Sequence, residues 1–384
     1  MNRTILALDF YGRGITAAFA SIDENTDTLR IRKIVRKECV SLSDAFVLDL
    51  EGAIREVNEL IAPLLAQAEN PPSVIAGLRG RFLTFQHRHG FATVMSRKHI
   101  VHDAEIEEAL KDSIPSNLDE SLEVLDTLPL SYNLDDSEGI INPLGLSGVI
   151  LDAETFVTFA QRSHLKNIKT VLSACGCEDA FVIATSVAIG ENMLEAAEQK
   201  GNTLVLDIGE KNTSALLYQK GSLLEGWEIG KGLNVLIANA AKVLQNDEET
   251  TWQVLCANEP GTDPYTDELW EDASAELLKT LKSEFLQSLP YLNHAPTHIL
   301  LSGNATNGIV LDQIKNIFNC KKVKVAVCSN VIADCRTNLP EYNGALSLLF
   351  HTLSRDGHSE ESAHPEEEGI LKGFLSKFGL GSLF

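Results

Sequence analysis

The chain has no apolar run of the ~18–20 residues needed to cross a bilayer, so the sequence predicts no membrane-spanning helix. A secretory signal is not expected either, because the residues after Met1 lead straight into a strand-like run that reaches an acid at Asp9. The cysteines number seven, an odd count, and include no Cys-x-x-Cys pair. We therefore expect reduced thiols rather than a disulfide framework or a zinc site.

Basic residues are also scarce, with 32 lysines and arginines against 54 acids and a formal net charge of -22. Nucleic acid is therefore not an expected partner, because binding to phosphates needs a basic surface. Contact with an anionic membrane would need a local basic patch. The length of 384 residues and the 44% hydrophobic content predict two domains or a duplicated, two-lobed fold.

Two similar hairpins stand out in this chain. In the second, an apolar run at 204–206 ends on Asp207, and a polar turn leads to another apolar run at 215–218. In the first, residues 5–8 lead to Asp9, a glycine-containing turn and a second apolar run. Such a repeat predicts two halves whose acid-bearing turns face one cleft, where backbone N–H groups and an Asp could hold phosphate and Mg²⁺. The alternative is two ordinary surface hairpins.

Alternating helix and strand patterns fill the rest of the chain, which predicts an α/β fold. Helices are expected at 45–68, 103–112, 164–174, 186–200, 235–244, 269–286, 311–318 and 343–353. Strands are expected at 74–78, 82–85, 91–95, 122–130, 156–160, 182–184, 298–302 and 322–327, and an acidic loop at 246–267. The glycine turn that contains Gly232 opens one of these helices and is a second candidate phosphate site.

Four histidines lie in the charged, irregular segment 79–161, which we interpret as an inserted subdomain: His87, His89, His99 and His102. None of them has metal-ligand spacing on one face of a helix. We expect them to be solvated or locally hydrogen-bonded, and we expect no metal site.

The last thirty residues change character. Residues 355–368 are polar and acidic, which is typical of a disordered linker. Beyond them, apolar residues fall on one helical face and lysines elsewhere: Ile370, Leu371, Phe374, Leu375 and Phe378, with Lys372 and Lys377. This pattern predicts an interfacial membrane anchor, the alternative being a helix that docks on the body or in a partner's groove. With two lysines, single-copy affinity should be marginal and self-assembly should strengthen it.

The segment from Glu138 to Val149 reads EGIINPLGLSGV. It resembles the EGIxNPxGxSGV stretch of the FtsA family of actin-like bacterial cell-division proteins. The helix containing 164–168, the Asp207 hairpin, the loop at 300–305 and the closing helix at 344–349 are also similar to FtsA segments. The C-terminal amphipathic tail stands where the family has its membrane-targeting sequence. The resemblance covers nearly the whole chain and is weakest at 245–297.

This resemblance implies an actin-like (ASKHA) α/β fold of two duplicated lobes with the FtsA-type 1C insertion. The implied ranges are 1–78 with parts of 163–200 and 330–354 for lobe 1 (1A), 79–162 for the SHS2-like 1C, 203–330 for lobe 2 (2A, with a smaller 2B at about 240–297), 355–368 for the linker and 369–384 for the membrane-targeting helix. It further implies a protein at the cytoplasmic face of the bacterial inner membrane, at the division site. Such a protein polymerises, binds the C-terminal tail of FtsZ to tether its filaments, and recruits later division proteins through 1C.

The family also implies ATP and Mg²⁺, and here the sequence departs from the pattern. Tyr11 takes a glycine position in the first phosphate loop, Glu210 and Ser214 alter the second, and Asn304 replaces a glycine in the adenosine loop. The family's Glu-x-x-Lys is not evident. We expect weak or absent nucleotide binding and no catalytic residue. If binding is retained, its residues would be Asp9, Gly12, Asp207, Gly209, Lys211, Gly232 and Gly303.

Two alternatives follow from the same resemblance. An active actin-like ATPase or kinase would be favoured by intact glycine loops. A relative of PilM, the pilus-assembly protein, should lack both the amphipathic tail and the Asn142–Val149 stretch.

Overall fold

The computed structural model describes residues 3–12, 14–23, 28–68, 70–195, 198, 200–257, 263–288, 296–303, 308–327, 332–335 and 340–356. Residues 369–384, with the expected membrane-binding side chains from Ile370 to Phe378, lie outside this part of the chain, as does nearly all of the expected linker. Within the described part, no helix combines the length and the apolar character needed to span a membrane.

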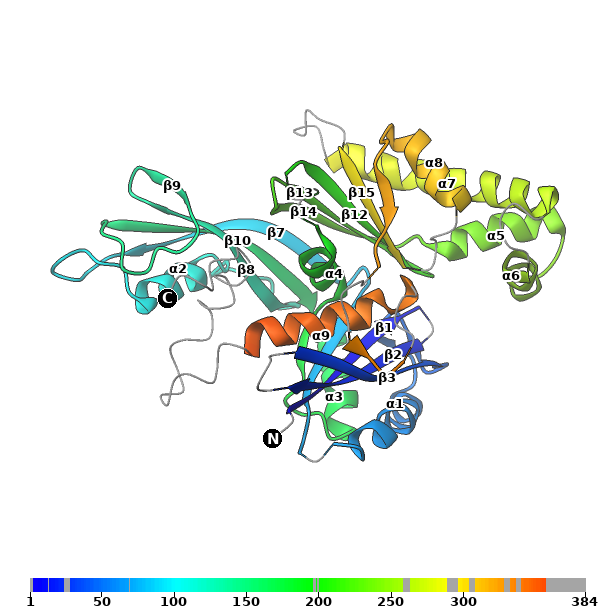
Figure 1. The fold of residues 1–384 in the computed structure, drawn as a ribbon, viewed down its shortest axis with the longest axis horizontal. Coiled ribbons are helices and arrows are strands. Elements are labelled where there is room, and N and C mark those ends of the chain that lie inside the picture. Colours follow the sequence, from blue (N-terminus) through cyan, green and yellow to red (C-terminus); the bar gives the residue numbers. More distant parts are fainter. Residues whose placement is uncertain are drawn as a thin grey trace.

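The first lobe is built on a six-stranded sheet in the order β11-β6-β1-β2-β3-β17 (Figure 1). Its strands are β1 (Arg3–Tyr11), β2 (Gly14–Asp23), β3 (Thr28–Glu38), β6 (Ser73–Leu78), β11 (Phe181–Ala184) and β17 (Ile332–Ala333). Side chains alternate between two faces along β1, so Leu6 and Leu8 enter one core while Ile5 and Ala7 enter another.

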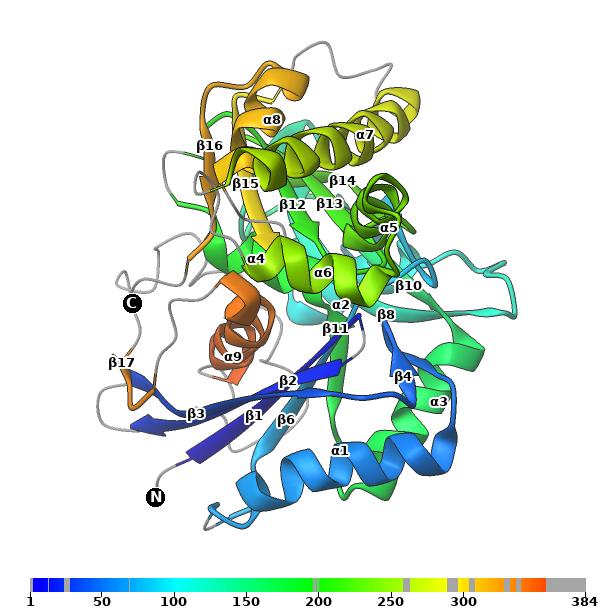
Figure 2. The same ribbon diagram turned by 90° about the vertical axis from the view of Figure 1, so that its right-hand side faces the viewer.

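Helices cover both faces of this sheet. The helices α1 (Leu50–Leu65) and α3 (Arg162–Ala174) pack on one side, and α4 (Thr185–Met193) and α9 (Asn343–Asp356) on the other (Figure 2). A small hairpin of β4 (Leu42–Ser43) and β5 (Phe46–Val47) precedes α1. The helix α9 lies between the sheets of the two lobes. Its first turn contacts Asp9 and Arg79 through Gly344.

The second lobe repeats the first. Its sheet has the order β14-β13-β12-β15-β16, which matches β3-β2-β1-β6-β11 in both order and strand direction. The strands are β12 (Asn202–Ile208), β13 (Thr213–Gln219), β14 (Ser222–Ile229), β15 (His298–Gly303) and β16 (Val323–Val325). The helices α5 (Leu233–Leu244), α7 (Pro264–Ser288) and α8 (Gly308–Phe318) pack on the outer face of this sheet, and α6 (Glu248–Ala257) packs against α5 and α7. The repeat predicted from the two Asp-bearing hairpins is therefore present in the fold.

An inserted domain projects from the side of the first lobe (Figure 1). It is an antiparallel sheet in the order β7-β10-β8-β9, formed by β7 (Leu83–Thr93), β10 (Ile150–Gln161), β8 (Leu122–Leu134) and β9 (Ser137–Ile140). The helix α2 (Asp103–Asp112) covers one face and closes a small core of its own. The backbone of Gly90 lies against the carbonyl of Ala109, a contact that a β-carbon would block.

Some predicted boundaries are wrong. The two irregular strands expected at 82–85 and 91–95 are one strand, β7, in which the polar residues 86–89 alternate between the two faces of the sheet. The expected loop at 246–267 contains α6, whose start is stabilised by the Asp247 carboxylate, 2.8 Å from the amide of Thr250. The helix expected at 186–200 ends at Met193, and α9 continues into the expected linker as far as Asp356.

Candidate functional site

The contact between the two lobes brings the two predicted acids to one arginine. Asp9 and Asp207 stand near the ends of the repeated strands β1 and β12, and Arg79 follows directly after β6, which runs parallel to β1. One guanidinium nitrogen of Arg79, Nη2, lies 3.0 Å from Asp9 Oδ2, and Nε lies 3.1 Å from Asp207 Oδ2. A single guanidinium therefore bridges the two lobes.

This bridge is deeply buried. The side chains of Asp9 and Asp207 are each 1% exposed and that of Arg79 is 7% exposed. The contact with Asp9 is a hydrogen-bonded ion pair, whereas that with Asp207 is an ion pair without hydrogen-bond geometry. Burial disfavours the charged guanidinium, but the carboxylates of Asp207 and Asp9 outweigh this effect and raise the pKa of Arg79.

Neighbouring elements close around Asp9. The hydroxyl of Thr185, at the start of α4, donates to Asp9 Oδ1 at 3.1 Å. Burial raises the pKa of Asp9, and the charge of Arg79 opposes this shift. The backbone of Gly344, in the first turn of α9, lies so close that a β-carbon would overlap with Asp9 Oδ2 and Arg79 Nη2. The bridge is thus covered by the start of α9.

The first turn is filled by its own side chains and by those of the second lobe. The ring of Tyr11 is buried, and the guanidinium carbon of Arg36 lies 4.1 Å from its centre. The side chain of Glu210 rests against Gly12, where a β-carbon would overlap with its carboxylate. The carbonyl of Gly12 also accepts a hydrogen bond from the amide of Asp44 at 2.7 Å. The two turns are therefore in direct contact.

The second turn is closed onto α5. The carbonyl oxygens of Gly209 and Glu210 accept hydrogen bonds from the amides of Leu233 and Asn234, at 3.0 and 2.7 Å. These amides belong to the first turn of α5, so the glycine turn at Gly232 presents them to protein rather than to an anion. Lys211 reaches back to the first lobe, with Nζ 2.7 Å from Ser43 Oγ.

The remaining predicted residue, Gly303, ends β15 beside Asp207. It has a positive φ of 88° and its α-carbon faces the carbonyl of Ile208, so a side chain would not fit there. Asn304, expected in the adenosine loop, lies outside the described residues.

Glu228 on β14 extends the polar network towards the inserted domain. Its Oε2 accepts hydrogen bonds from the amide of Gly80 at 3.1 Å and from Asn212 Nδ2 at 3.0 Å, and its Oε1 accepts one from Ser214 at 2.7 Å. Burial raises the pKa of Glu228 to about 7, although these hydrogen bonds oppose the shift. Sequence reasoning missed both Arg79 and Glu228. An arginine directly after a buried strand was the available signal for Arg79.

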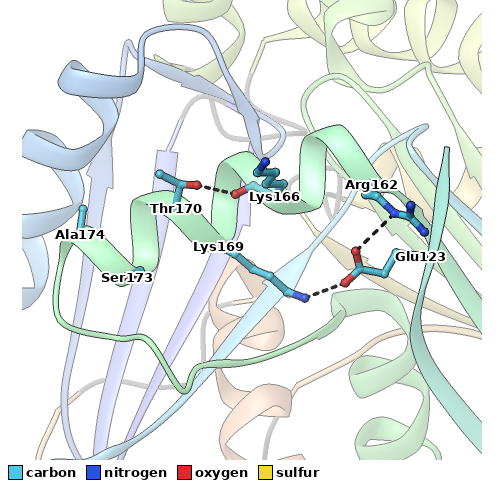
Figure 3. A pocket seen from close by; sticks show the side chains of 7 residues that line it. All are labelled: Glu123, Arg162, Lys166, Lys169, Thr170, Ser173 and Ala174. Atoms are coloured by element: carbon cyan, nitrogen blue, oxygen red, sulfur yellow. Dashed lines mark hydrogen bonds and ion pairs between the residues drawn. The ribbon is translucent and has the colours of Figure 1, made fainter. Parts of the chain in front are cut away.

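A separate depression of about 570 Å³ lies along α3, away from the bridge (Figure 3). It is lined by Glu123, Arg162, Lys166, Lys169, Thr170, Ser173 and Ala174. Glu123 pairs with Lys169 at 2.8 Å and with Arg162 at 3.9 Å, so two of its three cations are already partnered.

The described cleft has little capacity for metal-assisted phosphate chemistry. Mg²⁺ needs oxygen ligands at 2.0–2.1 Å in an octahedral arrangement. The two acids that would supply them each direct an oxygen at Arg79, and its permanent positive charge repels a cation. The residues present in this arrangement do not fit a Mg²⁺–nucleotide pair.

Comparison with known proteins identifies the inserted domain and the fold. Residues 80–158 match the SHS2 domain inserted in FtsA. The cell-division protein FtsA of Buchnera aphidicola is 23% identical over 341 residues, which is 80% of this chain and 79% of that protein. FtsA of Escherichia coli K12 is 27% identical over 197 residues, or 51% of this chain, and the match spans 46% of that protein.

Solved structures agree on the fold. A chain of the PilM-PilN type IV pilus biogenesis complex superposes with a TM-score of 0.65 at 18% identity, covering 91% of this chain and 98% of that one. MreB5 of Spiroplasma citri bound to ADP gives a TM-score of 0.50 at 11% identity, covering 91% and 95%. The chain therefore has the actin-like fold, with an FtsA-type SHS2 insertion, as predicted.

Proposed function

Since the chain is a divergent relative of the FtsA cell-division proteins, we propose that it polymerises on the inner membrane at the division site, tethers FtsZ filaments there and recruits later division proteins. The observation that carries this proposal is the inserted domain, which matches the FtsA-type SHS2 domain and stands between β6 and α3 of the first lobe. On this proposal, residues 369–384 contact the membrane and the inserted domain recruits later division proteins. The segment of FtsZ that is bound is its C-terminal tail.

We further propose that this adaptor works without nucleotide. The family resemblance implies ATP and Mg²⁺, but Arg79 stands between the two acids of the cleft, and Glu210 fills the space beside Gly12. On this proposal the bridge takes over the task of holding the lobes together. The active-ATPase alternative is disfavoured on the same grounds.

The PilM-like alternative has one observation in its favour, the TM-score of 0.65 to a chain of the PilM-PilN complex. At 18% identity that likeness concerns the fold alone. The FtsA-type match of residues 80–158 favours the division role.

Co-sedimentation tests the proposal most directly. Full-length protein and a variant lacking 369–384 are mixed with liposomes of bacterial inner-membrane lipids, with and without FtsZ of the same organism. We expect the full-length chain to pellet with liposomes and to carry FtsZ with it, and the truncated variant to do neither. Phe374→Glu should reproduce the loss, and Ser376→Ala is the matched control. Pelleting that does not change on truncation would overturn the anchor, and pelleting without FtsZ would overturn the tethering role.

A further inference from the structure

The face of the inserted sheet that lies opposite α2 brings together two histidines and a glutamate. His87 and His89 are two residues apart on β7, so their side chains share one face of the strand. Glu154 on β10 is the direct cross-strand partner of His89 and projects from the same face. The helix α2 packs on the opposite face, which leaves these side chains partly exposed, at 28%, 47% and 31%.

The three side chains are close enough to share one ion. One ligand atom from each residue lies within 4.8 Å of the others, and His87 Nε2 is 2.9 Å from Glu154 Oε1. Tetrahedral bonds of about 2.1 Å to Zn²⁺ place ligand atoms about 3.4 Å apart. Small side-chain adjustments would therefore suffice, without movement of the two strands.

Further groups hold two of these side chains in the required orientation. Nδ1 of His89 lies 3.0 Å from Asp152 Oδ1, and Asp152 Oδ2 accepts a hydrogen bond from Asn133 at 3.1 Å. A carboxylate at Nδ1 favours the tautomer with a proton there, which leaves the lone pair of Nε2 available to a metal. Ser131 donates to the second oxygen of Glu154 at 2.5 Å, leaving Oε1 for the shared position.

We propose that His87, His89 and Glu154 form a binding site for Zn²⁺ or a chemically similar divalent transition metal. Two imidazoles and one carboxylate are a donor set that Zn²⁺ accepts, with a fourth position left for water or for a group from a partner. The site is independent of the interlobe cleft and of the proposed division role. The three side chains are partly exposed, so a fourth ligand from another molecule could reach a bound metal.

Metal titration of the full, tag-free chain tests this assignment. Calorimetry with Zn²⁺ should give one site per chain, and Co²⁺ should give the visible absorption of a tetrahedral complex with nitrogen and oxygen ligands. The variants His87→Gln, His89→Gln and Glu154→Gln should each weaken binding at least tenfold. Asp152→Asn should weaken it by about 10–100-fold while keeping one site per chain. The matched control is His298→Gln, which removes a histidine from the second lobe.

The cysteines remain in every variant, so zinc held by thiols would give unchanged titrations in all of them. Unchanged affinity in His87→Gln and Glu154→Gln, or no binding at micromolar Zn²⁺, would overturn the site. Thermal melting of each variant without metal checks that the fold is intact.

Discussion

Replacement of Arg79 by methionine should be strongly destabilising, because it leaves two buried carboxylates without their cationic partner. Breaking a buried ion pair by removing one partner typically costs about 3–5 kcal/mol. Each unpaired carboxylate can be neutralised by taking up a proton. At pH 7 this costs about 4 kcal/mol for an acid with an ordinary pKa near 3.9. We therefore expect Arg79→Met to lower the free energy of unfolding by about 3–5 kcal/mol if water can reach one of the two acids and keep it charged. The loss should be larger if both acids must be protonated.

Urea unfolding of both proteins at pH 7 and pH 5 measures this loss. The destabilisation should shrink at pH 5, because protonation of a stranded carboxyl then costs about 2.7 kcal/mol less. The triple variant Arg79→Met, Asp9→Asn, Asp207→Asn should recover most of the stability, since neither position 9 nor position 207 then carries a buried charge. Arg79→Lys offers a milder test if the methionine variant does not fold. It keeps the charge but cannot reach both acids with a planar fork.

The matched surface control is Arg30→Met. Arg30 pairs with Asp334 at 2.9 Å, but the two side chains are 48% and 38% exposed, so its loss should cost less than about 1 kcal/mol. If Arg79→Met is as mild as this control, or if the triple variant is no more stable than the single one, the bridge does not hold the lobes together.

Three further predictions follow from the same cleft. Glu228 has its pKa raised to about 7 in the folded state, so its contribution to stability is fully present below its unfolded pKa and is lost as pH rises through about 7. Glu228→Gln should remove about 1–3 kcal/mol of this pH dependence, measured by urea unfolding at pH 5 and pH 8. An unchanged pH profile would contradict this prediction. At 1 mM, Mg²⁺–ATP should move the melting temperature by less than about 1 °C, whereas a ligand with a Kd of 10 μM would add about 2.7 kcal/mol and a clear shift. Gly344→Ala should destabilise by about 1–3 kcal/mol, because its methyl group would overlap with Asp9 and Arg79, and calorimetric melting that matches the parent would refute this packing.

The two-lobed fold was predictable because it is encoded locally. Each repeated hairpin carries its own apolar alternation and its own Asp, so two short stretches 5–20 and 204–218 were enough to propose the duplication. The bridge was not predictable in this way. Arg79 contacts Asp9 and Asp207 only after three strands from different parts of the chain have packed together, and no local sequence pattern predicts this contact.

The candidate metal site was missed for a different reason. On a helix, residues two apart point in different directions, so the spacing of His87 and His89 does not match a helical metal site. In β7 the same spacing puts both on one face, and the partner carboxylate comes from a strand more than sixty residues later. The correct secondary structure at this segment would have brought the two histidines together, whereas Glu154 required the strand register as well.

Two actin-like lobes held together by Arg79 would be regulated differently from two lobes held together by a bound nucleotide. A bound nucleotide can be hydrolysed or exchanged, so it offers two states of the cleft, whereas a covalently attached guanidinium is always present. Assembly would then be governed by mass action, through the local concentration that a membrane surface or a partner filament provides. We therefore expect filament formation, followed by light scattering with and without liposomes, to depend on lipid surface and protein concentration and to be unaffected by ATP, ADP or their removal. Assembly that requires ATP would show that the Arg79 bridge opens to admit nucleotide. That result would overturn the proposal that the adaptor works without nucleotide.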